Sequence, residues 1–289
     1  MKRILFFSVP LLVALNLFAK EVYIGPGPNA QERLQEALIL MEEGDTLIIK
    51  SGYYKFEDGL SLDVDDVTVK GEGIDSTILD FKNQQSGAQG LLVTSDKVTL
   101  SDFSILDAKG DALKVIGAKG INMINLKTEW TGGPKNTNGA YGFYPVESED
   151  VLIDGCVAIG ASDAGIYVGQ SKNIIVRNSI AQYNVAGIEI ENSYYADVYN
   201  NLASHNTGGI LVFDLPDLPQ QGGHHIRVFN NKSIDNDFKK YEIIYSNKKN
   251  GIKKLLGNYY NRDSLKYNVF DFDPTIENWF WIKAGNCCC

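Results

Sequence analysis

The stretch GIYVGQSKNIIVRNSIAQYNVAGIEIENSYYADVYN, residues 165–200, contains one pattern written twice. A glycine opens a short apolar run at Gly165 and again at Gly187, which is 22 residues later. The triplets that end at Asn178 and Asn200 are also 22 residues apart. Self-similarity at a fixed period of roughly 20–50 residues is the signature of a repeat architecture, in which each repeat is one structural unit.

The repeat extends well beyond this stretch. Most steps between successive openings are 22 or 23 residues long, and two coils of 30 residues each carry 8 extra residues. Further openings lie at Gly90, Ala112, Gly142 and Gly209, and a further asparagine marker lies at Asn230. The extra residues fall in EWTGGPKNTNG, Glu129 to Gly139, and in DLPDLPQQGG, Asp214 to Gly223.

Each repeat contains short runs that alternate and are rich in β-branched residues, such as NIIVRNSIA and KVTLSDFSIL. Runs of this kind form strands, with Gly and Asn at the bends between them. Three short strands per repeat predict an all-β fold, a single right-handed parallel β-helix over residues 20–237. A leucine-rich repeat would need a regular leucine frame, and a propeller needs a period about twice as long.

Coils of such a solenoid stack at roughly 4.8 Å, so equivalent residues form ladders along the axis. Two apolar ladders are expected inside, Ile166 with Ile188 and Ile210, and Val168 with Ile190 and Val212. A ladder of side-chain amides is expected at a bend, formed by Asn178, Asn200 and Asn230. Asparagine suits such a bend because it tolerates a left-handed backbone and can bond to its copies.

The open N-terminal end of the stack is expected to carry a helical cap, because an uncovered sheet edge invites aggregation. The segment NAQERLQEALILMEEGDTLII begins with Asn29 and Glu32 in the spacing of a capping box. Gly44 is the predicted helix end. The apolar face would be Leu34, Ala37, Leu38 and Met41.

The two chain termini depart from the repeat. Residues 1–19 have a basic start at Lys2 and Arg3, an apolar run and a small-residue site at Ala19, which predicts a cleaved signal peptide and export to the periplasm or the exterior. Residues 238–289 are rich in Lys, Asn and Tyr and do not follow the period. They are predicted to form an irregular tail, either a cap or a segment that is not native to the repeat.

Charge and cysteine content limit the functional classes. The net charge is −9, and removal of a signal peptide would make it more negative still, which argues against nucleic-acid binding. Of the four cysteines, Cys156 is isolated and three adjoin at the end, so no disulfide framework or metal motif is predicted. No cofactor is expected, although Ca²⁺ in the acidic ladder remains open.

The outward-facing ladders of the coils opened by Gly142, Gly165, Gly187 and Gly209 mix aromatic, amide and carboxylate side chains, whereas a purely structural face would more often carry Thr, Lys and Ser. The two insertions flank this face and are expected to wall a groove that binds a glycan. The candidate substrate-binding residues are Trp130, Tyr167, Gln170, Glu191 and Asn192, and the candidate catalytic residues are Tyr141, Tyr144, Glu147, Glu189 and Asp214. Taken one at a time, each of these residues also has an ordinary structural explanation.

Residues from about Val22 to Asp237 resemble the pectate-lyase-like right-handed β-helix superfamily and, within it, exported repeat proteins of uncharacterised function. The segments GASDAGIYVGQSKNIIVRN and NTGGILVFDLPDLPQQGGH carry this resemblance. A weaker likeness to alginate C5-epimerases rests on YGFYPVE, Tyr141 to Glu147. That family has Tyr-Gly-x-Asp-Pro-His-(Asp/Glu) there, so its Asp is replaced by Tyr144 and its His by Val146.

These departures bear on the predicted chemistry. Abstraction of the C5 proton of a uronate needs a base, an acid and a group that neutralises the sugar carboxylate. Tyr141 could supply one proton-transfer group, but the strand has no His and the face no Arg. The sequence therefore predicts an exported protein that binds, and in one version modifies, a polysaccharide or cell-envelope glycan. The alternatives are a non-catalytic scaffold that binds a protein partner, and a glycoside hydrolase with paired carboxylates, because Glu189 and Glu191 would lie about 7 Å apart on one strand.

Overall fold

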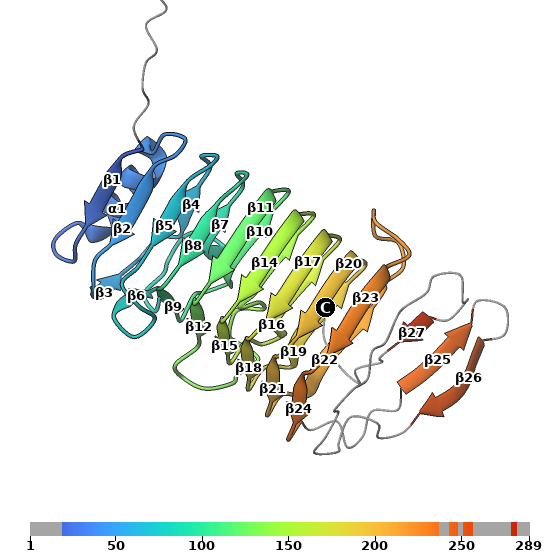
Figure 1. The fold of residues 1–289 in the computed structure, drawn as a ribbon. Coiled ribbons are helices and arrows are strands. Elements are labelled where there is room, and N and C mark those ends of the chain that lie inside the picture. Colours follow the sequence, from blue (N-terminus) through green and yellow to red (C-terminus); the bar gives the residue numbers. More distant parts are fainter. Residues whose placement is uncertain (1–18, 237–242, 248–250, 257–278, 282–289) are drawn as a thin grey trace, which may run out of the picture.

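The computed structural model describes residues 19–236, 243–247, 251–256 and 279–281. Three parallel sheets wind into a right-handed β-helix whose strands succeed one another along one axis (Figure 1). The predicted all-β solenoid is confirmed. The expected signal peptide, residues 1–19, lies almost wholly outside the described residues, as does most of the expected tail.

Each sheet takes one strand from successive coils. Sheet A consists of β1 (Glu21–Ile24), β2 (Thr46–Ile49), β5 (Thr68–Lys70), β8 (Thr99–Ser101), β11 (Lys119–Ile124), β14 (Glu149–Asp154), β17 (Lys172–Arg177), β20 (Tyr194–Tyr199) and β23 (His224–Phe229). Sheet B consists of β3 (Gly52–Lys55), β6 (Thr77–Asp80), β9 (Ser104–Leu106), β12 (Lys127–Glu129), β15 (Val157–Ile159), β18 (Ile180–Gln182), β21 (Leu202–Ser204) and β24 (Lys232–Ile234).

Sheet C carries the face that the sequence singled out. It consists of β4 (Leu60–Leu62), β7 (Gln89–Val93), β10 (Asp111–Ile116), β13 (Phe143–Val146), β16 (Ala164–Gly169), β19 (Ala186–Glu191) and β22 (Gly208–Phe213). Three further strands, β25 (Ile243–Asn247), β26 (Gly251–Leu256) and β27 (Trp279–Trp281), form a separate antiparallel sheet.

The apolar ladders form as predicted. Ile166 pairs with Ile188 and Ile188 with Ile210, and Val168, Ile190 and Val212 follow in the same register. Ile166, Ile188 and their valine and isoleucine neighbours on β16 and β19 are fully buried in one continuous core. The 22-residue period therefore fixes which side chains stack.

The amide ladder forms at a different position from the predicted one. Asn178, Asn200 and Asn230 have positive φ angles of 52°, 58° and 54°, as a left-handed bend requires, but they are exposed. The ladder that forms is Asn184, Asn206 and the half-buried Asn236, in which Nδ2 of Asn184 donates to Oδ1 of Asn206 at 3.0 Å and Asn206 donates to Asn236 at 3.1 Å. A second, shorter ladder joins Asn201 to Asn231.

The amide ladder explains why glycine opens the coils at Gly165 and Gly187. A Cβ built on Gly165 would lie 2.5 Å from Nδ2 of Asn184, and one built on Gly187 would lie 2.8 Å from Nδ2 of Asn206. Any side chain at these openings would displace the amide. Gly and Asn therefore recur with the same period because they fill one volume between them.

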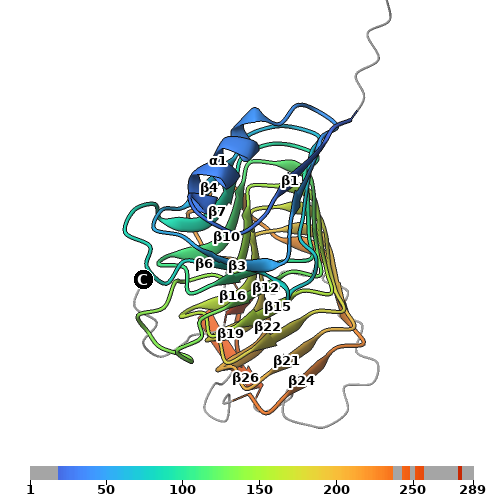
Figure 2. The ribbon, with the colours of Figure 1, turned by 90° about the vertical axis from the view of Figure 1, so that its left-hand side faces the viewer.

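Helix α1 (Ala30–Leu40) lies at the N-terminal end of the stack (Figure 2). It buries Ala30, Leu34 and Leu38, with Met41 just beyond its end. Two details of the prediction are wrong. Asn29 has a left-handed backbone and makes no side-chain capping bond, so no capping box forms, and the helix ends at Leu40 rather than at Gly44.

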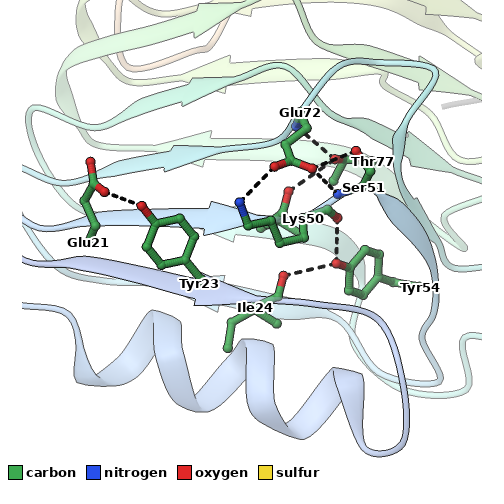
Figure 3. Close-up of polar contacts among 9 residues, drawn as sticks. Glu21, Tyr23, Ile24, Lys50, Ser51, Tyr54, Glu72 and Thr77 are labelled. Carbon is green, nitrogen blue, oxygen red and sulfur yellow. Dashed lines mark hydrogen bonds and ion pairs between the residues drawn. The ribbon is translucent and has the colours of Figure 1, made fainter.

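Polar side chains tie the first coils together (Figure 3). The Glu72 carboxylate accepts hydrogen bonds from Nζ of Lys50 at 3.0 Å and from the backbone nitrogen and Oγ of Ser51, both at 2.7 Å. The Tyr54 hydroxyl donates to the backbone oxygens of Lys50 and Ile24. These bonds join β1, β2 and β3 to the following coil at the end that α1 covers.

Candidate functional site

The outward face of sheet C carries a column of large side chains from consecutive coils. Strand register places Lys114 beside Tyr144, Tyr167 beside Glu189, and Glu189 beside Leu211. The pairs on either side of Tyr144 and Tyr167 place these two in the same column. The predicted column of Tyr144, Tyr167 and Glu189 is therefore present. We call this column and its flanking residues the outer C face.

Three tyrosines form the centre of the outer C face. The ring centroids of Tyr141 and Tyr144 are 4.4 Å apart, those of Tyr141 and Tyr167 are 4.8 Å apart, and Tyr144 meets Tyr167 edge-on at 5.0 Å. The rings pack with Ala164, Ala186, Leu211 and Phe213 in a second apolar cluster outside the solenoid core.

Gly169 makes room for one of these rings. A Cβ at this position would lie 2.2 Å from the Tyr167 hydroxyl oxygen and within 2.5 Å of its ring. The absence of a side chain lets Tyr167 lie along its own strand toward Gly169, where its hydroxyl bonds to the Glu191 carboxylate. The ring is 5% exposed, so Tyr167 is a fixed part of the site.

Carboxyl groups surround the tyrosines. The Tyr141 hydroxyl bonds to the Asp163 carboxylate in the same way as Tyr167 bonds to Glu191. Burial raises the pKa of both tyrosines, and the neighbouring carboxylates raise it further. Each hydroxyl therefore keeps its proton and donates it in the hydrogen bond, which favours the ionised form of Asp163 and Glu191.

Glu189 differs from the other carboxyl groups. It is 8% exposed, and burial, with smaller contributions from Asp163 and Glu191, raises its pKa to about 8. Within the described part of the chain it has neither a hydrogen bond nor an ion pair. At neutral pH Glu189 is consequently a protonated acid, and it lies beside Asp163 and Glu191, whose pKa values burial also raises although the tyrosine hydroxyls partly oppose the shift.

Two predicted site residues hold the second insertion in place. Asn192 is fully buried, where its Nδ2 donates to the backbone oxygens of Leu215 and Gln220 and its Oδ1 accepts from the nitrogen of Leu215. Asp214 is 9% exposed and accepts a 2.8 Å hydrogen bond from the nitrogen of Gly223. Burial raises the Asp214 pKa, and bonds to backbone groups oppose that shift. Neither side chain has a free polar edge on the outer C face.

Glu147 and Gln170 lie at a corner rather than on the face. Their φ angles are 53° and 49°, so the chain turns from sheet C toward sheet A at these positions and the strand alternation ends. Both line a hollow of about 680 Å³ together with Lys119, Lys172 and Gln220. The corner hollow adjoins the outer C face, and the second insertion forms part of its wall through Pro219 and Gln220.

Trp130 is placed in the core. It is 4% exposed, and its Nε1 donates to the backbone oxygen of Ala108 at 2.8 Å. The first insertion that follows it is fastened to the next coil, because Nδ2 of Asn138 donates to the oxygen of Gly160 at 2.6 Å. The two insertions project from opposite ends of the strands (Figure 1), but the structure does not bring Trp130 to the outer C face.

The sequence analysis did not identify three residues of the outer C face. Asp111 directly precedes the opening residue Ala112, and Asp163 lies two residues before the opening residue Gly165. Lys114 belongs to a coil upstream of the four that were compared, and its Nζ lies 4.7 Å from the centroid of Tyr144. Extending the outward column by one coil, and inspecting the two residues before each opening, would have identified all three.

The described residues contain neither a metal-binding group of side chains nor a helix that could span a membrane. Within the described residues, no three His, Cys, Asp or Glu side chains are grouped so that they could hold a metal ion. Among the same residues, no helix has the length and apolar character needed to cross a bilayer. Val146, which replaces the epimerase histidine, is 6% exposed on β13.

Comparison with known families settles the class of the chain. The family model described as "Right handed beta helix region" matches residues 39–259. The chain belongs to this family. Comparison with curated proteins gives no match.

Among solved structures, the chain is similar to the PL6 family alginate lyase AlyGC, with 14% identity, a TM-score of 0.40, and coverage of 73% of this chain and 39% of that chain. It is also similar to pectate lyase Pel9A, with 15% identity, a TM-score of 0.40, and coverage of 76% and 71%. The A-module of the Azotobacter vinelandii mannuronan C-5 epimerase AlgE6 matches with 13% identity, a TM-score of 0.26, and coverage of 72% and 81%. This chain thus spans about two fifths of the alginate lyase.

Proposed function

We propose that this β-helix protein is exported and binds a polysaccharide on its outer C face. The observation that carries the proposal is the packing of Tyr141, Tyr144 and Tyr167 beside the carboxyl groups of Asp163, Glu189 and Glu191. Aromatic surfaces accept the apolar faces of sugar rings, and carboxyl groups bond their hydroxyls. Neighbouring coils repeat these groups along the axis, which suits a chain of sugar units.

The charge of the face argues against an acidic substrate. Asp111, Asp163 and Glu191 all interact with this cluster, and each would repel a uronate carboxylate when it is ionised. Arg177 belongs to sheet A, where it is paired with Asp154 at 2.7 Å and with the Tyr199 hydroxyl at 3.1 Å. The proposal is therefore a neutral or cationic glycan rather than alginate or pectate.

Binding can be tested by affinity electrophoresis through gels that contain single polysaccharides. The protein should be retarded by at least one glycan without carboxylates, and Tyr144→Ala should reduce that retardation. Tyr195→Ala is the matched control, because Tyr195 is a 54% exposed tyrosine on sheet A. Normal mobility of the folded protein across neutral, cationic and acidic glycans would refute glycan binding and favour a scaffold that receives a protein partner.

Glycoside hydrolysis is a second candidate, favoured by the protonated state of Glu189. Glu189 and Glu191 alternate on one strand, so their carboxyl groups project about 7 Å apart, within the roughly 6.5–9.5 Å range of inverting enzymes. Glu189 would protonate the glycosidic oxygen, and Glu191, with the Tyr167 hydroxyl bonded to it, would take a proton from the attacking water.

Hydrolysis is tested by the release of reducing ends from any glycan that binds. Glu189→Gln should abolish release even at glycan concentrations that saturate the variant, and activity should decline as the pH rises past about 8, where Glu189 loses its proton. Activity that persists in Glu189→Gln would remove this residue from the reaction.

A further inference from the structure

The outer C face gathers four carboxyl groups, and Lys114 acts on one of them, Asp111. Burial raises the pKa of Asp111, Asp163, Glu189 and Glu191, and for Glu189 and Glu191 the neighbouring carboxylates raise it further. Carboxylates elsewhere on the surface are paired differently. Glu149, for example, lies 3.2 Å from Nζ of Lys119 and 3.0 Å from Nζ of Lys172.

Glu189 is a buried carboxyl group that has no positively charged partner among the described residues. Its side chain is more than nine-tenths buried and lies in the electrostatic reach of Asp163 and Glu191. Within the described residues it has no hydrogen bond and no ion pair. A buried carboxyl group without a partner is unfavourable for folding unless a ligand supplies the partner.

The tyrosines show what kind of cation the face accepts. The ammonium group of Lys114 lies 4.7 Å from the centroid of the Tyr144 ring, at the edge of the cluster. Attraction of this kind between an ammonium and an aromatic face is general, and aromatic groups bind ligand ammoniums by the same means. The contact between Lys114 and Tyr144 is therefore an example, within the protein, of the contact that the amino group of a ligand would make further along the column.

We propose that the outer C face is selective for a glycan that carries free amino groups, such as an oligomer of 2-amino-2-deoxyhexose. This inference rests on the proposed function and names the substrate class for it. A ring face of the sugar would lie against Tyr144, which is half-buried. A protonated amino group would lie between Glu189, Asp163 and Glu191 and supply the charge that they lack.

The primary test compares four soluble oligomers of equal length: glucosamine, N-acetylglucosamine, neutral glucose and galacturonate. We expect the glucosamine oligomer to bind at least about tenfold more tightly than its N-acetylated form at mildly acidic pH and low salt, with the difference reduced by added salt. Glu189→Gln and Glu191→Gln should each remove most of this difference. Glu36→Gln, the same substitution at an exposed glutamate on α1, is the control and should bind like the wild type.

The outcomes separate this inference from the function on which it rests. Equal binding of the amino and N-acetyl oligomers, or preference for a neutral or acidic one, would overturn selectivity for amines and leave glycan binding intact. Binding of none of the oligomers would overturn both. Oligolysine that binds as tightly as the glucosamine oligomer would overturn the assignment to a glycan.

A second measurement asks whether Glu189 is the partner of the ligand charge. An N-trimethylated glucosamine oligomer carries a charge that does not titrate, so any proton exchanged on binding comes from the protein. Calorimetry near neutral pH in buffers of different ionisation enthalpy should detect proton release from the wild type, because a bound cation favours ionised Glu189. Glu189→Gln should release none. Binding without proton release from the wild type would overturn the placement of the amine at Glu189.

Discussion

The burial of Glu189 opposes folding at any pH at which this carboxyl group would be ionised in the unfolded chain. Its pKa of about 8 in the folded chain exceeds the ordinary value of 4.5, so between these two pH values the folded state holds a proton that the unfolded state has lost. Stability must therefore decline as the pH rises through this window. Buried groups that oppose folding in this way are concentrated at functional sites.

Glu189→Gln is accordingly expected to stabilise the protein. The amide keeps the shape of the protonated acid and removes the penalty of ionisation, so the gain should be small at about pH 5 and on the order of a few kcal/mol above about pH 8. Urea unfolding followed across this pH range measures it, with Glu36→Gln as the control. A variant with the same pH dependence as the wild type would mean that Glu189 is not the titrating group.

Asn206 is the residue on which the amide ladder depends most. Its Nδ2 donates to the oxygen of Ala181 and to Asn236, and its Oδ1 accepts from the nitrogen and Nδ2 of Asn184. Asn206→Ala removes all four of these bonds and leaves the buried backbone nitrogen of Asn184 without its partner, which should destabilise the protein by about 2–4 kcal/mol. Thermal or urea unfolding measures the loss.

The control for this ladder is Asn200→Gly. Asn200 is exposed, and glycine adopts its φ of 58° without strain, so this variant should lose well under about 1 kcal/mol. If Asn200→Gly were as harmful as Asn206→Ala, the ladder first expected from the sequence would be the important one.

The difference between the two ladders shows what a repeat can and cannot predict. The period fixed that Asn178 and Asn200 are equivalent, as are Asn184 and Asn206, since equivalence needs only spacing. Which set points inward depends on φ at the bends between sheets, and the sequence contains no regular alternation there. The glycine that opens each coil was the usable signal, because it leaves space for an amide.

At the scale of elements, strands were predictable and their ends were not. The alternation along β16 and β19 placed Tyr167 and Glu189 outward and Ile166 and Ile188 inward, as the structure has them. Gln170 and Asn192, which follow the last residues of these strands, have left-handed backbones that end the alternation, so placing them on the outward face gave the wrong surroundings. The strand register was consequently predicted correctly for the column and incorrectly for its corner.

The contacts between the first coils predict how the N-terminal elements respond to acid. Three hydrogen bonds from Ser51 and Lys50 lower the Glu72 pKa to about 2. The stabilisation is therefore present above about pH 4.5 and is lost as the pH falls toward 2, where Glu72 takes up its proton.

Glu72→Gln should remove this acid dependence from the N-terminal coils. Because Glu72 is exposed, the change in Tm at neutral pH should be a few degrees at most, and the difference from the wild type should vanish near about pH 2. Melting curves at several pH values measure it, and Glu43→Gln, another exposed glutamate, serves as the control. A difference that grows as the pH falls would contradict the assigned sign.

At the scale of the whole molecule, the stack is a one-dimensional object. Each coil contacts the coils next to it, so stability is approximately a sum of coil terms and neighbour terms. The outer C face spans β10 to β22, whereas α1 packs at the opposite end of the stack, so damage at one end should reach the other only weakly (Figure 1).

Leu38→Ala in α1 tests this independence. Leu38 is 2% exposed, and its truncation should cost about 2–5 kcal/mol locally. Native-state hydrogen exchange should then accelerate in β1 to β4, while amides of β16 and β19 keep their protection and glycan affinity is unchanged. Ile39→Ala, at a 63% exposed position on the same helix, should alter neither. Uniform loss of protection from β1 to β23 would mean that the solenoid unfolds as one unit, and the site could then not be treated separately from its cap.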